Sequence, residues 1–256
     1  MQVQELEIEN AASREAVNAA WHNVPSALYA LNYELEELKE QLTSKKSKSD
    51  PDAIKKGLET ISFYVDVAQA ELDLAQLLLD QGDPVIRLTD VRVDLGVLLK
   101  GFQARRNKGR EVYNKLHLDI ALKTLENVPE DLKVARGVII SAVSNFLKNS
   151  MKFAPPHSTI DVNVEYTATD PRQGTLLVSV SDQGMGMTTD ELARVFDKGD
   201  TIGLDNLQIR WRKGSGKGLK TVAAFVSAAG GTYGAESAGP GQGATFWIRV
   251  PAHPAP

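Results

Sequence analysis

The stretch DQGMGM at residues 182–187 is the part of the sequence from which its fold class can be worked out. It directly follows LLVSVS at 176–181, a run that predicts a β-strand. The strand would deliver the carboxylate of Asp182, which can accept a hydrogen bond from an exocyclic amine such as that of adenine. Gly184 and Gly186 have no side chains, so the backbone there can lie close to a flat ring. This pattern predicts one wall of a nucleotide pocket.

The stretch NFLKNSMKFAP at 145–155 supplies polar side chains that suit the same ligand. It belongs to a run at 129–154 that predicts one long helix. The spacing of Asn145, Asn149 and Lys152 places two amides and an ammonium on one helical face. An amide oxygen is a hard ligand for Mg²⁺, and a lysine pairs with phosphate as a point charge. This face therefore favours a bound magnesium–phosphate group.

Two later stretches, one polar and one rich in glycine, complete the pattern. VFDKGD at 195–200 opens a polar connection. GSGKGL at 214–219 precedes a predicted helix, so backbone N–H groups and the positive helix end face an anion. A glycine-rich turn is by itself a weak signal, and this one does not match the P-loop pattern GxxxxGK[ST]. The four stretches in this order are hard to obtain by chance, and together they favour a nucleotide site.

The N-terminal part of the chain, 1–83, has the periodicity of two amphipathic helices. Apolar residues recur at alternating intervals of three and four on both sides of the polar loop TSKKSKSDPD at 43–52, which indicates an antiparallel helical hairpin. The first seam consists of Trp21, Val24, Leu28, Leu31, Leu35, Leu38 and Leu42, and the second of Ile54, Leu58, Ile61, Val65, Ala68, Leu72, Ala75 and Leu79. Because a lone hairpin leaves such seams exposed, we expect a homodimer with a four-helix bundle. The alternative is that the seams pack on the rest of the chain.

The remainder of the chain, 84–256, mixes strand and helix patterns. LTDVRVD at 88–94 and KLHLDIAL at 115–122 carry strand-like alternation, with a predicted helix at 93–106 between them. Further strands are predicted at 160–168, 175–182, 231–237 and 244–251, and a further helix at 218–230. Strands and helices in this arrangement indicate an α+β domain.

The composition excludes several classes of protein. The chain has 256 residues and a net charge of -4, which does not indicate a nucleic-acid-binding protein. It contains no cysteine and therefore no disulfide framework, thiol nucleophile or zinc ribbon. No apolar run approaches the ~20 residues that span a bilayer, and the N-terminus MQVQELEIEN is unlike a signal peptide. We expect a soluble, cytoplasmic chain with no membrane segment, which could still be a piece of a larger protein.

The four stretches resemble the sequence boxes of a known ATPase family. NFLKNSMKFAP, DQGMGM, VFD at 195–197 and GSGKGL are similar to the asparagine, first glycine, phenylalanine and second glycine boxes of the histidine-kinase ATP-binding domain. That domain belongs to a superfamily shared with DNA gyrase, a heat-shock chaperone and a mismatch-repair protein. The resemblance covers 85–251. It implies an α/β sandwich, in which a mixed sheet packs on helices and ATP lies beneath a flexible lid between Asp197 and Gly214.

The resemblance also assigns roles to single residues. It implies that Asn149 coordinates Mg²⁺, that Lys152 meets phosphate and that Asp182 binds adenine. The other ATP-binding residues that it implies are Asn145, Gly184, Gly186, Gly214, Gly216, Lys217, Gly218 and Leu219. Lys217 replaces a usually apolar residue, so it either adds a phosphate contact or points to solvent. Asn145 stands where hydrolytic members carry a Glu that activates water, and an Asn cannot act as a general base. The pocket therefore suits transfer of the γ-phosphoryl group to an acceptor other than water.

His22 is the candidate acceptor of that phosphoryl group. It lies on the first heptad helix but off the apolar seam, where a buried structural histidine is not expected, and an ordinary surface histidine is the alternative. Its surroundings resemble the phosphoacceptor helix of the family, with two departures. Asn23 replaces the Glu or Asp that takes the imidazole proton, and the kinking Pro25 lies two residues before the proline of the family. Ser26 occupies the place where a Thr or Asn often positions water for dephosphorylating the partner.

Three functions stay open at this point. The first is an ATP- and Mg²⁺-dependent protein histidine kinase of a two-component system, which phosphorylates its own His22. It would then pass the phosphoryl group to an aspartate of a response-regulator receiver domain. The second is a nucleotide-binding pseudokinase or a histidine phosphotransferase, which Asn23 and the displaced proline favour. The third is a serine kinase of the same superfamily, against which a heptad hairpin with an exposed histidine argues.

Overall fold

The computed structural model describes residues 119–197 and 217–255, most residues of 87–102, and single positions at Leu35 and between 51 and 72. The described positions between 51 and 72 are helical. The predicted hairpin as a whole and the boundary between 1–83 and 84–256 lie outside the described residues and stay predictions. So do five of the predicted site residues, namely His22, Asn23, Ser26, Gly214 and Gly216.

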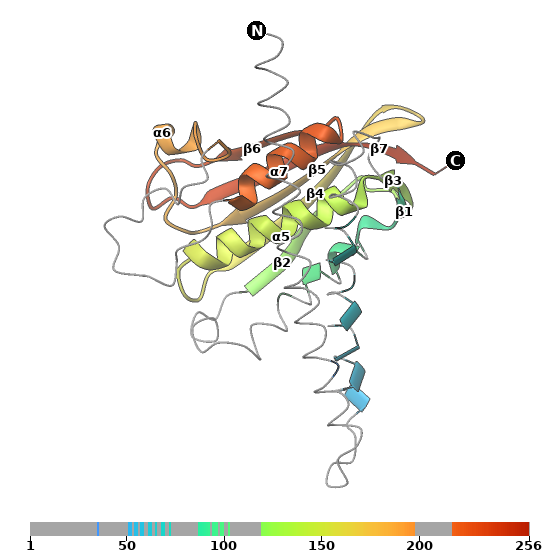
Figure 1. The fold of residues 1–256 in the computed structure, drawn as a ribbon, viewed down its shortest axis with the longest axis horizontal. Helices are drawn as coiled ribbons and strands as arrows, with labels where there is room; N and C mark the ends of the chain where they lie inside the picture. Colours follow the sequence, from blue (N-terminus) through green and yellow to red (C-terminus); the bar gives the residue numbers. More distant parts are fainter. Residues whose placement is uncertain are drawn as a thin grey trace.

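One mixed sheet runs through the described part of the chain (Figure 1). Its strands are β1 (Arg87–Thr89), β2 (Asp119–Glu126), β3 (Leu132–Val134), β4 (Thr159–Asp170), β5 (Gln173–Asp182), β6 (Thr232–Glu236) and β7 (Ala244–Pro254). They lie in the order β1-β3-β7-β5-β4-β2, and β6 pairs with β7. β2 and β4 are parallel, and the other paired strands are antiparallel. β5 is therefore central, and its last residue, Asp182, lies at the edge where the strand ends.

Two helices, α5 (Arg136–Phe153) and α7 (Lys217–Ala228), cover one face of the sheet (Figure 1). α5 contacts both β5 and α7, and almost every residue in its first three turns is buried. It ends at Phe153 because Pro155 forces the preceding Ala154 into extended backbone. A short helix, α6 (Thr189–Leu192), follows β5 and begins with a capping box. None of the described helices is long and apolar enough to cross a membrane.

Alternating residues of the long strands form the core beneath these helices. The fully buried set includes Ile160, Val162 and Val164 of β4, Leu176, Val178 and Val180 of β5, and Ile248 and Val250 of β7. Each such side chain contributes about 1.5–3 kcal/mol when it leaves water. The residues between them in sequence are half-buried or exposed, which is the alternation that the sequence shows. The predicted fold class of this part, a mixed sheet packed on helices, is confirmed.

The structure corrects the predicted helix over 129–154. Its beginning is strand β3, and helix α5 starts only at Arg136. Leu132 and Val134 are fully buried, and β3 pairs with β1 on one side and with β7 on the other. Pairing in the sheet and burial therefore outweigh the helical pattern of this segment.

The predicted strand over 88–94 is also wrong in its second half. β1 ends at Thr89, and the described positions from Val91 to Phe102 are helical. Asp90 causes the change, because its carboxylate accepts a hydrogen bond of 2.9 Å from the backbone N–H of Arg92, as side chains at helix starts do. A short polar side chain thus ends the strand and begins the helix.

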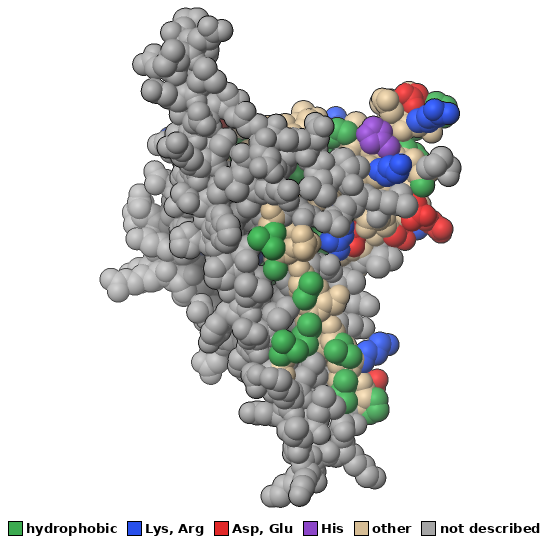
Figure 2. All heavy atoms as spheres, turned by 45° about the vertical axis from the view of Figure 1, so that its right-hand side comes forward, with side chains coloured by type: hydrophobic (Ala, Val, Ile, Leu, Met, Phe, Trp, Pro, Cys, Tyr) green, Lys and Arg blue, Asp and Glu red, His purple; other side chains and the backbone are tan. Residues whose placement is uncertain are grey.

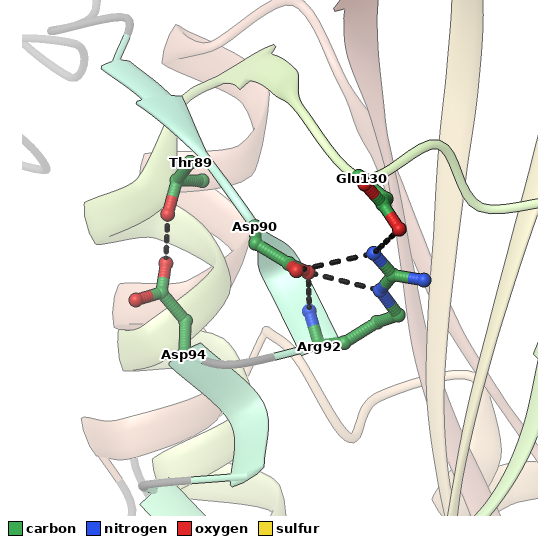
Figure 3. A network of polar contacts seen from close by, with 5 residues as sticks. All are labelled: Thr89, Asp90, Arg92, Asp94 and Glu130. Atoms are coloured by element: carbon green, nitrogen blue, oxygen red, sulfur yellow. Dashed lines mark hydrogen bonds and ion pairs between the residues drawn. The ribbon is translucent and has the colours of Figure 1, made fainter.

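A network of charged side chains fixes this helix start against the rest of the domain (Figure 3). Arg92 binds Asp90 at 3.0 Å and Glu130 at 3.7 Å, and its hydrogen bond to Asp90 raises the pKa of the guanidinium. Asp94 accepts a hydrogen bond from Thr89 and two more, at 2.8 and 2.9 Å, from Arg136 at the start of α5. The segment after the predicted hairpin is therefore tied to the helix that carries the candidate site.

Candidate nucleotide site

The carboxylate of Asp182 is the centre of the candidate site. Asp182 is half-buried at the end of β5. Its Oδ1 accepts a hydrogen bond of 2.8 Å from the backbone N–H of Gly184, and its Oδ2 accepts one of 2.8 Å from the hydroxyl of Ser150. Ser150 is fully buried on α5. Both oxygens are thus fixed, and the end of β5 is joined to the end of α5.

The two glycines of DQGMGM are required by the packing of their own loop. A Cβ at Gly184 would lie 2.7 Å from Oδ1 of Asp182 and 3.0 Å from the backbone oxygen of Phe153. Gly186 has a φ of +64°, and a Cβ there would lie 2.0 Å from the backbone oxygen of Gly239. Protein atoms therefore already take up the space beside these glycines. Their predicted close approach to a base stays a prediction.

A second loop, Ser237–Gly243, holds the first loop in place. The backbone N–H of Met187 donates to the hydroxyl of Ser237 at 3.0 Å, and that of Gly241 donates to the backbone oxygen of Met185 at 2.6 Å. The hydroxyl of Ser237 also donates to the backbone oxygen of Gly243 at 2.7 Å. The glycine cluster GPGQG at 239–243 is typical of a turn, but no sequence pattern indicates its contact with the first loop.

Helix α5 presents the predicted polar residues at its C-terminal half. Asn149 and Lys152 are half-buried, and Nζ of Lys152 lies 4.7 Å from the ring centroid of Phe153. Asn145 is buried, and its amide nitrogen donates to the backbone oxygen of Ser141 at 2.9 Å. The described residues contain no group of three or more His, Cys, Asp and Glu side chains that could hold a metal ion. A magnesium site here therefore depends on the predicted ligand Asn149.

The start of α7 meets α5 at Asn145. A Cβ at Gly218 would lie 2.6 Å from Oδ1 of Asn145, so any side chain at this position would require the amide of Asn145 to move. Leu219 is half-buried and packs against the core. The structure thus brings the second glycine box to the asparagine box through Gly218, whereas nothing is described of the side chain of Lys217.

The phenylalanine box anchors the chain where the predicted lid begins. The ring of Phe196 lies 4.7 Å from that of Tyr233 and 6.4 Å from that of Phe246, measured between centroids. Val195 also packs against the core. Both contacts fix the backbone just before Asp197, the last described residue before the predicted lid.

Comparison with known proteins gives the family of this segment. Residues 136–254 match the family described as histidine kinase-, DNA gyrase B-, and HSP90-like ATPase. This segment of the chain is thus similar to the ATPase domains of that family. All the predicted ATP-binding residues except Gly214 and Gly216 lie in the described part of this ATPase domain.

Several curated relatives of this chain are named as sensor or histidine kinases. The sensor-like histidine kinase SenX3 of Mycolicibacterium smegmatis is 27% identical over 120 residues, which is 47% of this chain and 29% of SenX3. The sensor histidine kinase WalK of Bacillus subtilis is 31% identical over 134 residues, which is 50% of this chain and 20% of WalK. The chain thus spans less than a third of the length of these two relatives.

Among solved structures, full-length ShkA in complex with AMPPNP shares the fold. The TM-score is 0.53 at 21% sequence identity, and the match covers 94% of this chain and 46% of ShkA. At this identity the similarity supports the fold of the ATPase domain and carries no information on its chemistry.

Proposed function

We propose that this protein is an ATP-dependent protein histidine kinase that phosphorylates His22 and passes the phosphoryl group to an aspartate of a response-regulator receiver domain. The proposal rests on the hydrogen bond of 2.8 Å from the hydroxyl of Ser150, on α5, to the carboxylate of Asp182. Both residues lie in the segment that matches the histidine kinase-type ATPase family. This hydrogen bond fixes the residue predicted to bind adenine relative to the helix that carries Asn149 and Lys152.

The roles at the site follow from the chemistry of its side chains. Asp182 accepts a hydrogen bond from the 6-amine of adenine, and Lys152 binds phosphate. Asn149 would hold Mg²⁺ through its amide oxygen, and the ion would neutralise charge on the phosphates. The backbone N–H groups around Gly218, at the start of α7, bind the phosphates. The match of residues 136–254 to a family of ATPases supports ATP as the ligand.

Asn145 favours transfer to a side chain over hydrolysis. An amide cannot take a proton from water, and the amide nitrogen of Asn145 is already bound to the backbone oxygen of Ser141. In the proposed reaction, the unprotonated ring nitrogen of His22 attacks the γ-phosphorus. A nitrogen–phosphorus bond forms, the bond to the β–γ bridging oxygen breaks, and ADP leaves. The ring proton then passes to solvent, since Asn23 cannot accept it.

A homodimer through the predicted hairpin belongs to this proposal. Leu58, Val65 and Leu72 follow one another at intervals of seven residues and are 57%, 50% and 41% exposed. Hydrophobic side chains lie in a row along the lower part of the view in Figure 2. An apolar row at this spacing is typical of a helix that pairs with another helix. A second copy of the chain would cover it.

A second function, a pseudokinase or histidine phosphotransferase, is favoured by Asn23 and Pro25. The side chain next to His22 cannot take its proton, and the proline lies two residues before the position that the resemblance implies. Such a protein would bind ATP without labelling itself, or would accept a phosphoryl group at His22 from a receiver domain.

Incubation of the full chain with [γ-³²P]ATP and Mg²⁺ tests which of these functions is present. We expect acid-labile label on the unaltered protein and on a His253→Gln control, and none on His22→Gln, because only His22 accepts the phosphoryl group. Full labelling of His22→Gln would contradict the kinase proposal. ATP binding without label would favour the pseudokinase, and acid-stable label on serine would favour a serine kinase.

A further inference from the structure

The hydroxyl of Ser150, on helix α5, donates a hydrogen bond to the carboxylate of Asp182 at the end of strand β5. We propose that Ser150 is a positioning residue, which orients Asp182 toward a base amine and thereby sets the preference of the site for adenine over purines that lack the 6-amine. The proposal rests on the proposed function, in which Asp182 binds adenine. It adds a specificity determinant that the sequence pattern did not identify.

Two hydrogen bonds fix the orientation of the Asp182 carboxylate, which can still accept further hydrogen bonds from a ligand. An ionised carboxylate has about four acceptor sites on its two oxygens. One site on Oδ1 is taken by the N–H of Gly184 and one on Oδ2 by the hydroxyl of Ser150, both at 2.8 Å. The remaining sites can only accept, so a ligand that meets them favourably must present a donor. The 6-amine of adenine is such a donor, whereas a bare C–H at that position is not.

The two donors constrain the carboxylate in different ways. Gly184 lies two residues after Asp182 and forms part of the same turn, so it follows the movements of that turn. Ser150 lies 32 residues earlier on α5, and its contact fixes the carboxylate relative to a rigid, buried helix. Ser150 is 0% exposed, so bulk water does not reach its position to replace the hydroxyl. Removal of this hydroxyl therefore frees the carboxylate to turn.

Ser144 provides a matched control on the same helix. It is 1% exposed, and its hydroxyl has no hydrogen-bond partner among the described residues. Ser144→Ala and Ser150→Ala both remove one buried hydroxyl from α5. Only the second change removes a contact with Asp182, so the difference between the variants reports that contact.

The test measures the affinities of the full chain for ATP and for purine riboside triphosphate, which lacks the 6-amine. We expect the unaltered protein and Ser144→Ala to prefer ATP by about tenfold. Ser150→Ala should bind ATP about five- to tenfold more weakly, with the affinity for purine riboside triphosphate unchanged within about twofold. The preference for the amine then nearly disappears.

Three outcomes would overturn the proposal, and they are distinguishable. An unchanged preference in Ser150→Ala, or an equal loss of affinity for both nucleotides, removes the positioning role but leaves the ATP site. An unaltered protein that binds neither nucleotide refutes the proposed function and this proposal together. If Ser150→Ala does not fold, Ser150→Cys, with a weaker donor of similar size, replaces it. An intermediate preference is then expected, and an unchanged one contradicts the proposal.

Discussion

The hydroxyl groups of Ser150, Ser144 and Tyr166 are all buried, but their surroundings differ. Ser150 donates to Asp182, whereas the other two hydroxyls have no partner among the described residues. The hydroxyl of Tyr166 faces Gly174, where a Cβ would lie 2.4 Å away. A buried hydroxyl without a partner costs stability, because it loses its hydrogen bonds to water on folding. Tyr166 and Ser144 are therefore sites at which an apolar residue should be tolerated.

Tyr166→Phe should raise the stability of the domain by about 1 kcal/mol at neutral pH, since it removes an unpaired buried hydroxyl. Burial, and secondarily the charge of Asp170, raises the pKa of Tyr166 above its ordinary value of 10.0. The folded state therefore holds this proton more tightly than the unfolded state. The resulting stability is present below pH 10 and is lost as the pH rises through the pKa of the folded state.

Urea unfolding of both proteins between pH 7 and pH 11 measures this effect. The unaltered protein should lose more stability above pH 10 than Tyr166→Phe does. Parallel pH curves for the two proteins would contradict the account of this residue.

The polar residues of the site differ in how far the sequence could predict them. Asn145, Asn149 and Lys152 lie within two turns of one helix, so their spacing alone places them on one face. The contact between Ser150 and Asp182 joins residues from two elements, and no local pattern indicates it. Ser237 was missed for the same reason, because it acts on a loop 50 residues earlier in the chain.

At the scale of elements, α5 links the segment after the predicted hairpin to the candidate site. Its first residue, Arg136, binds Asp94 through two hydrogen bonds, and its last turns carry Asn149, Ser150 and Lys152. The Asp94 and Arg136 side chains are only 16% and 17% exposed. A pair with two hydrogen bonds at this burial contributes more than an exposed ion pair does.

Arg136→Gln should therefore lower the free energy of unfolding by about 1–3 kcal/mol, because it leaves the carboxylate of Asp94 without its charged partner. Arg92→Gln is the comparison, since the Arg92 side chain is 31% exposed and its partners Asp90 and Glu130 are 28% and 86% exposed. We expect a smaller loss of stability for this variant, because water screens a more exposed ion pair. Chemical denaturation of both variants measures the difference. Equal stabilities would contradict the claim that the pair of Asp94 and Arg136 stabilises the domain more than the contacts of Arg92 do.

The strands of this domain could be predicted to different extents. β4, β5 and β7 are long, and their alternating apolar residues were sufficient to predict them. β3 has only three residues, and it exists because β1 and β7 pair with it, which no window of sequence contains. The end of β1 depends on one side chain, that of Asp90. Short elements are thus set by tertiary contacts rather than by periodicity.

For the whole molecule, the proposed function depends on the ATPase-like segment at 136–254. Its fold could be predicted because four polar motifs and the strand pattern lie in one continuous part of the chain. The hairpin, the dimer and His22 were predicted from heptad spacing and resemblance. The exposed Leu58, Val65 and Leu72 are consistent with that spacing. In the proposed kinase, the hairpin brings the acceptor His22 to the site, and this role requires that the site binds ATP.

Isothermal titration of the full chain and of Asp182→Asn with AMPPNP in magnesium buffer tests that requirement most directly. Both proteins should unfold at similar temperatures, so that a difference in binding reports the site. We expect measurable heat of binding for the unaltered protein and at least about tenfold weaker binding for Asp182→Asn, since the variant loses a charged acceptor for the base amine. No heat with the unaltered protein, or equal affinities for the two proteins, would contradict the account.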